Sequence, residues 1–268
     1  MGFIKDIDES QAPLLDHLIE LRARLLRAVA ALAVAFFVCL YFAKDIFGFL
    51  VVPLTEAFPP GQGRLVYTKL YEQFFVELKV ALFAAFFVSF PVIANQLWAF
   101  IAPGLYAKEK KAFLPFLIAT PILFGMGAAL AYYVVMPTAF HWMLGFQGSA
   151  GGLTLEALPA VGDYLSLVMQ FILAFGISFL LPVLLLLLNR AGIVKREQLI
   201  SARRYMIVAA FAIAAVATPP DVISQLMLAI PLIALFESSL LAMRFLEKRD
   251  AEEAAAAAED SAEGPVTE

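Results

Sequence analysis

Long apolar runs recur along the chain and are separated by short polar segments. A helix needs about 20 apolar residues to cross the hydrocarbon core of a membrane. Six runs are candidates for such helices: Leu25 to Ala43, Phe74 to Phe100, Ala112 to Met136, Tyr164 to Leu188, Tyr205 to Ala217, and Val222 to Met243. The pattern therefore predicts an all-α, polytopic membrane protein with six transmembrane helices in one integral membrane domain over residues 1–246.

The fifth run differs from the others in its length. Because a helix rises 1.5 Å per residue, Tyr205 to Ala217 reaches only about 20 Å. The bilayer must thin there, flanking residues must reach the interface, or a neighbouring chain must cover the gap. Residues 218–221 contain two prolines and lead directly into the sixth run, so we expect these two helices to form a tight hairpin.

Three segments outside the runs also have a predictable character. Residues 13–24 are expected to form an interfacial helix, because four leucines recur there at helical spacing: Leu14, Leu18, Leu21 and Leu25. The segment 45–74 is too long for a bare turn and suggests a structured cap with a short helix starting near Tyr67. Residues 247–268 form an acidic, alanine-rich tail without a core to join, and we expect this tail to be disordered.

The composition excludes a soluble protein. Hydrophobic residues make up 62% of the 268 residues and charged residues 16%, against about half and about a quarter in an average soluble domain. One soluble domain could not bury so much apolar surface, which excludes a soluble enzyme and a nucleic-acid-binding protein. The single cysteine, Cys39, lies in an apolar run, so neither an internal disulfide nor a thiolate metal site can form.

Basic residues indicate the orientation in the membrane. An even number of spans places both termini on one side, and 15 of the 19 lysines and arginines fall on that side. The opposite side keeps four of them: Lys44, Arg64, Lys69 and Lys79. The positive-inside rule then predicts that both termini lie in the cytoplasm.

The sequence contains no convincing catalytic motif. The two histidines, His17 and His141, fall on opposite sides of the membrane in this topology, which excludes a His-His metal pair, and no phosphate-binding glycine loop occurs. Residues 160–163 approach the G-x-G-D signature of intramembrane aspartyl proteases, but the first glycine is Ala160 and no second aspartate lies within an opposing span. Asp163 is better interpreted as the N-cap of the fourth span. We therefore predict no catalytic residue, no cofactor and no metal site.

Two carboxylates lie at the predicted cytoplasmic surface, Glu20 and Glu109. In a structural interpretation, Glu20 pairs with Arg24 one helical turn away and Glu109 offsets its neighbouring lysines. The rival interpretation needs a cationic ligand, because two neighbouring carboxylates can accept guanidinium groups bidentately, a geometry that lysine cannot reproduce. Spacing alone favours the structural interpretation, since surface ion pairs are common and weak.

Three stretches resemble signature sequences of the TatC family, the receptor subunit of the twin-arginine protein translocase. They are His17 to Arg22, Gln96 to Tyr106, and Thr218 to Gln225. The similarity extends from about Leu14 to Arg244, with the signatures in the right order and at the right topological places. It implies six spans in a curved, glove-like arrangement, which agrees with the six apolar runs.

The resemblance also implies a function. Glu20 and Glu109 would bind the paired arginines of twin-arginine signal peptides on folded precursors, and Arg22 would belong to the same signal-peptide-binding site. Single-span membrane proteins of the TatA and TatB type would be recruited in the lipid bilayer, in a homo- and hetero-oligomer whose transport runs on the proton-motive force. Such a protein lies in the bacterial plasma (inner) membrane and has no nucleic-acid partner.

One position departs from the family pattern. Family members often have a glutamate in the fourth span, where this chain has Leu180. Gln170 cannot replace it, because ten residues along a helix displace a side chain by about 15 Å. Gln170 and Gln225 share a depth near the outer ends of their spans. With Thr218, they are expected either to contact a partner helix or to form hydrogen bonds between helices of this chain.

Asp221 has two interpretations of its own. It directly follows Pro220 and precedes the sixth apolar run. Its carboxylate is placed to cap the sixth helix, or to serve in transport, and both roles are compatible.

Two other classes of function stay open from the residues alone. A secondary transporter of a small solute should have a binding site at the membrane midplane and often has repeated halves, and the sequence indicates neither. A passive scaffold for other membrane proteins would differ from a receptor in binding no signal peptide.

Overall fold

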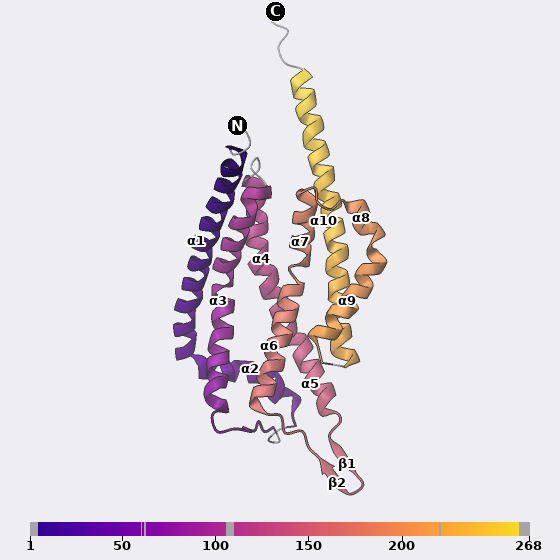
Figure 1. Ribbon diagram of the computed structural model, residues 1–268. Helices are drawn as coiled ribbons and strands as arrows, with labels where there is room; N and C mark the ends of the chain where they lie inside the picture. The colour runs from indigo at the N-terminus through magenta and orange to yellow at the C-terminus, as the bar shows by residue number, and fades with distance from the viewer. Residues whose placement is uncertain (1–4, 60, 62, 106–109, 220, 263–268) are drawn as a thin grey trace, which may run out of the picture. The chain divides into compact units, whose positions relative to one another are not determined.

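The computed structural model describes all residues except 1–4, 60, 62, 106–109, 220 and 263–268. The chain forms two compact units, Met1–Gly176 and Ile177–Glu268. Both are helical, as Figure 1 shows. Within the described residues, five stretches are long and apolar enough to cross a membrane: His17–Tyr41, Glu72–Phe100, Phe116–Leu144, Val161–Arg190 and Val222–Arg249. The predicted all-α, polytopic fold is confirmed.

Small residues bring the first two long helices of the first unit together. Helix α1 (Lys5–Tyr41) lies along α3 (Glu72–Leu105), side by side in Figure 1. The buried residues of this contact are short: Ala35 and Cys39 on α1, and Ala81 and Ala85 on α3, joined by Ala43 at the start of α2. Within a bilayer, helices associate through close van der Waals packing rather than by leaving water, so short side chains favour this contact.

Helix α1 corrects one sequence expectation. The structure contains a single continuous helix over Lys5–Tyr41, whereas a separate interfacial helix was expected over residues 13–24. No proline or glycine falls between Pro13 and Tyr41. The sequence therefore contains no residue that would interrupt the helix where the amphipathic segment meets the apolar one.

The predicted cap contains a helix, but not where the sequence suggested. Helix α2 (Ala43–Ala57) includes Pro53. No helix begins near Tyr67, because the described residues 63–71 are not helical and the next helix begins at Glu72. The helix expected near Tyr67 is therefore wrong. Proline has no N–H, which leaves the carbonyl four residues earlier without its helical partner. That carbonyl belongs to Phe49 and accepts a 2.6 Å hydrogen bond from the Tyr132 hydroxyl.

A cluster of aromatic rings fills the space between α3 and α4 (Lys110–Leu130). Phe90 and Phe124 stack with ring centroids 3.8 Å apart, and Phe86 and Phe87 also contact Phe124. Helix α6 (Val161–Ser178) meets this cluster through Gly176, where an added Cβ would lie 2.7 Å from a Phe124 ring carbon. Glycine is therefore needed for the close approach of α6.

The third apolar run contains a change of helix type. A π-helical turn, η1 (Ala131–Val135), joins α4 to α5 (Met136–Leu144). After α5, strands β1 (Gly148–Ala150) and β2 (Leu153–Leu155) form a hairpin. The two residues of its turn, Gly151 and Gly152, both have positive φ, at 61° and 86°, as a two-residue hairpin with this twist requires.

The fourth apolar run is not one uniform helix. Helix α6 ends at Ser178, and α7 (Leu181–Arg190) begins after a turn at Phe179 and Leu180. Pro182 explains the break, because it leaves the Ser178 carbonyl without an i→i+4 donor. At the turn, the Leu180 amide donates to the Ile177 carbonyl over 3.0 Å, a bond of the i→i+3 type.

The second unit is built around the predicted hairpin. Helix α9 (Arg203–Ala217) packs against α10 (Val222–Ala262), and α7 and the short α8 (Arg196–Ser201) also contact α10. A core of Phe236, Leu240 and Met243 holds the unit together. At 15 residues α9 spans roughly 22 Å, which confirms that the fifth run is short for a bilayer core of about 30 Å.

Helix α10 is longer than expected. It continues through Ala262, whereas the tail from residue 247 was expected to be disordered. Residues 251–258 are alanine and glutamate, both strong helix formers, and nothing between Met243 and Ala262 stops a helix already begun in the membrane. Residues 263–268 lie outside the described part of the chain.

Candidate functional site

Glu20 lies on α1 and forms an ion pair with Arg24. Arg24 donates to its Oε1 from Nε over 2.9 Å and from Nη2 over 2.5 Å. The side chains of Glu20 and Arg24 remain 35% and 21% exposed, so the pair lies at a partly wetted surface. The ion pair that spacing suggested is therefore present.

Aromatic stacking places this turn of α1 against the end of α3. The rings of His17 and Phe100 are stacked, with centroids 4.3 Å apart and planes 15° apart. Helix α3 then ends at Leu105, four residues before Glu109. Glu109 itself lies outside the described residues.

Arg22 does not lie next to the Glu20 carboxylate. Residues two apart on a helix point to different faces, and the Arg22 side chain is exposed. Among the described residues, the guanidinium that contacts Glu20 belongs to Arg24, a residue that the sequence analysis considered only as a structural partner.

The turn between α9 and α10 gathers three buried polar side chains. Asp221 Oδ1 accepts the Ser224 amide over 2.7 Å, which confirms that Asp221 caps α10. Thr218 is also buried, and its hydroxyl donates to the Ala214 carbonyl over 2.8 Å. Asp221 Oδ2 and Ser224 Oγ, both buried, have no hydrogen-bond partner in the described part of the chain. The turn therefore contains two buried polar oxygens that could still form hydrogen bonds.

Gln225 links the two helices of the hairpin. Its Nε2 donates to the Phe211 carbonyl of α9 over 3.3 Å. Gln170, in contrast, lies on α6 in the first unit with an exposed side chain. The structure thus brings Thr218, Asp221 and Gln225 together, and the predicted pairing of Gln170 with them stays a prediction.

Sequence reasoning missed a second polar arrangement, which we name the outer clasp: residues 66–72 together with residues 159–162. Val66 and Ala160 form a parallel bridge, in which the Val66 amide donates to Pro159 over 3.1 Å and the Val161 amide donates to Val66 over 3.0 Å. The clasp ties the start of α3 to the start of α6, two segments that are distant in sequence.

Glu72 lies at the centre of the outer clasp. Its Oε1 accepts the Gly162 amide over 2.8 Å, and its Oε2 accepts the Thr68 amide and hydroxyl over 2.7 and 2.9 Å. A Cβ on Gly162 would lie only 2.8 Å from Oε1. Glu72, and not Asp163 as the sequence suggested, is therefore the carboxylate that caps α6.

We expect Glu72→Gln to destabilise the first unit. The substitution replaces one acceptor oxygen with an NH2 donor among N–H and O–H groups that all donate, so at least one of them loses its partner. A lower unfolding temperature in detergent, together with faster proteolysis near residue 66, should report this change. Glu156→Gln makes the same charge change at an exposed position just after β2, and it should leave both measurements unchanged.

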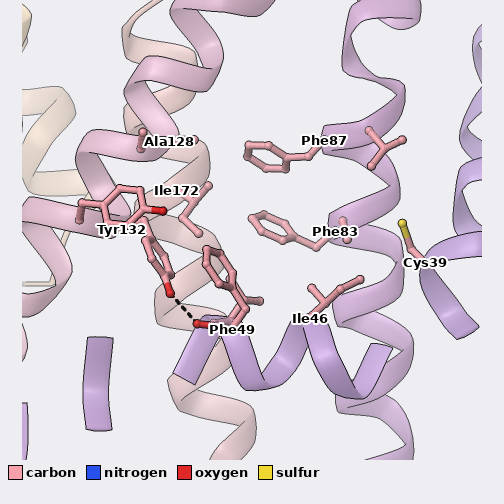
Figure 2. Close-up of a pocket in the computed structure, with 13 residues that line it drawn as sticks. Cys39, Ile46, Phe49, Phe83, Phe87, Ala128, Tyr132 and Ile172 are labelled. Carbon is pink, nitrogen blue, oxygen red and sulfur yellow. Dashed lines mark hydrogen bonds between the residues drawn. The ribbon is translucent and has the colours of Figure 1, made fainter. Parts of the chain in front are cut away.

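The first unit also contains a pocket of about 370 Å³. Figure 2 shows rings of Phe83, Phe87, Phe49 and Tyr132 around it, with Ile172 at one wall. Because the Tyr132 hydroxyl is bonded to the Phe49 carbonyl, the walls are almost entirely apolar. The pocket therefore offers little to a polar substrate, and no group of three His, Cys, Asp or Glu side chains able to hold a metal ion occurs among the described residues.

The five long apolar helices among the described residues define a multi-pass membrane protein. A family model described as Sec-independent protein translocase protein (TatC) matches residues 16–231. The chain therefore belongs to the TatC family, a family of translocase components rather than enzymes.

Curated relatives support this assignment over nearly the full length. A Sec-independent protein translocase protein TatC of Magnetococcus marinus is 51% identical over 248 residues, which cover 92% of this chain and 90% of the relative. The protein of the same name from Escherichia coli is 40% identical over 237 residues, covering 88% of this chain and 90% of the relative.

Solved structures give the same result. A crystal structure of the twin arginine translocase receptor TatC is 40% identical, with a TM-score of 0.71, and the match covers 84% of this chain and 96% of that one. A second crystal structure, of the receptor in DDM, is 39% identical with a TM-score of 0.74. Family membership decides against the solute transporter and makes protein translocation the role of this chain.

Proposed function

We propose that this chain is the signal-peptide receptor of a twin-arginine translocase in the inner membrane of a bacterium, with both termini in the cytoplasm. Glu20 and Glu109 bind the two arginines of the signal peptide, and Arg22 contributes on a neighbouring face of α1. Single-span proteins of the TatA and TatB type assemble with it. The excess of lysine and arginine on one side of the predicted topology supports this orientation.

The stacking of His17 on Phe100 is the observation that carries the proposal. It fixes the turn of α1 that contains Glu20 beside the last turns of α3. Glu109 follows Leu105 by four residues, a stretch that spans at most about 14 Å. We infer that two carboxylates from distant parts of the sequence come within reach of one short peptide segment, as recognition of adjacent arginines requires.

Site-specific photocrosslinking tests the proposal. A photoreactive residue at position 20 or 109 should crosslink to a twin-arginine precursor in native membranes, and excess twin-arginine signal peptide should compete with it. A photoreactive residue at position 156 provides the control, because it lies on the predicted opposite side of the membrane. Crosslinks at position 156 alone, or no competition at positions 20 and 109, would refute the assignment.

The second part of the proposal concerns the partner helix. The short α9 and the buried polar turn at Thr218, Asp221 and Gln225 support a docking surface near the end of the hairpin. Local thinning beside α9 favours a partner whose span is also short. Asp221 Oδ2 and Ser224 Oγ lack hydrogen-bond partners among the described residues but are buried, so a polar residue of that helix reaches them only if the turn opens.

Gln225→Leu separates docking from signal-peptide binding. We expect the variant to lose partner crosslinking at α9 and to block export, because the leucine removes a polar contact for the partner helix in a membrane environment. Signal-peptide crosslinking at position 20 should stay intact and serves as the internal control. Normal export with retained partner contacts would instead mean that Gln225 only joins α10 to the Phe211 carbonyl of α9.

A further inference from the structure

Arg24 competes with any cation that approaches Glu20. Both of its donated hydrogen bonds fall on one oxygen, Oε1, and among the described residues Oε2 accepts no bond. A guanidinium that binds a carboxylate as a fork needs both oxygens. An incoming arginine must therefore take Oε1 from Arg24, whereas an ammonium group needs only Oε2.

The two approaching cations meet different conditions. With Arg24 in place, the Glu20 charge is already compensated, so a compact ammonium is attracted by little net charge and is repelled by the neighbouring guanidinium. An arginine that displaces Arg24 can bind both oxygens of Glu20. The ion pair that it breaks is partly exposed and of the weak i,i+4 type. An arginine offsets the loss of the Glu20–Arg24 pair with two charge-assisted bonds, one to each oxygen. An ammonium on Oε2 gains one bond and stays beside the Arg24 guanidinium, which repels it. Arg24 therefore lowers the affinity for lysine more than the affinity for arginine.

We propose that Arg24 is a specificity-determining residue, a competing guanidinium built into the receptor that makes Glu20 select arginine over lysine. The inference rests on the proposed function, because it assumes that Glu20 meets the signal peptide. It adds a residue of this chain that discriminates between cations without itself binding the peptide.

The test compares two signal peptides, one with Arg-Arg and one with Lys-Lys, on the full-length protein in lipid nanodiscs. Arg24→Gln removes the competitor and restores the uncompensated charge of Glu20. We expect the affinity for the Lys-Lys peptide to rise about fivefold and that for the Arg-Arg peptide about twofold or less, as loss of a weak ion pair allows. The arginine preference should therefore fall.

Arg27→Gln is the matched control. Arg27 lies on the same helix with an exposed side chain, and the variant makes the same change of charge without touching Glu20. Its arginine preference should equal that of the unmodified protein. An equal fall in Arg27→Gln would overturn the proposal, because the effect would then be general electrostatics.

Two further variants keep the outcome decisive. Arg24→Lys retains the charge but offers a weaker partner to Glu20, so its arginine preference should lie between those of the unmodified protein and Arg24→Gln. An unchanged preference in both Arg24 variants overturns the inference. Glu20→Gln separates this failure from failure of the proposed function: if it binds both peptides as the unmodified protein does, Glu20 is not the receptor site.

Discussion

Glu20→Ala should weaken the binding of a twin-arginine signal peptide roughly tenfold or more. A hydrogen bond to a charged group contributes about 1.5–3 kcal/mol, and each 1.4 kcal/mol is a factor of ten in affinity. Alanine removes the acceptor and leaves Arg24 without its partner, which adds repulsion toward the incoming arginines. Peptide affinity, measured by fluorescence anisotropy in nanodiscs, should show the loss.

Glu156→Ala provides the reference for this measurement. It removes one carboxylate from the exposed segment after β2 and should bind the peptide normally. Equal affinities for the two variants would show that Glu20 is only a member of a surface ion pair, the structural interpretation that its spacing from Arg24 favours.

Gly176→Leu should strongly destabilise the first unit. The new Cβ would lie 2.7 Å from one Phe124 ring carbon and 3.0 Å from another. Phe124 is 2% exposed and is held by the stacked Phe90 ring, so it has no free space to enter. Overpacking of this kind costs about 1–3 kcal/mol, and the leucine has further atoms to place. The unfolding temperature in detergent should fall by several degrees.

Gly125→Leu distinguishes a clash from a general effect of leucine. Gly125 lies on α4, one residue after Phe124, and a Cβ there would meet no atom within 4 Å. This variant should unfold close to the unmodified protein. A comparable loss of stability in both variants would show that the contact between Gly176 and Phe124 is not what limits the packing of α6.

The membrane spans were predictable because their cause is local. An apolar run of sufficient length predicts a helix wherever it occurs, so the long runs, the short α9 and its hairpin with α10 were all visible in the sequence. Asp221 was likewise readable as a cap, because it directly precedes the helix that it caps.

The features that escaped prediction depend on partners far away in the chain. Pro53 argues against a helix in its own neighbourhood, yet α2 forms because Tyr132 takes over the carbonyl that Pro53 leaves free. Asp163 is well placed in sequence to cap α6, but Glu72 does so across 90 residues. Of the candidate site, the residue types and the Glu20–Arg24 pair were predictable from the sequence. The placement of both Arg24 donors on one oxygen of Glu20 was not, because it depends on side-chain rotamers that no sequence pattern specifies.

The outer clasp has a consequence for the order of events during synthesis. Glu72 emerges 90 residues before Gly162, a delay of roughly 5–18 seconds at a translation rate of about 5–20 residues per second. During that interval α1 and α3 can associate through their small side chains, but the start of α3 lacks the Gly162 amide that Glu72 will bind. A nascent chain arrested before residue 162 should therefore expose residues 66–72 to protease, and chains released after that point should resist it.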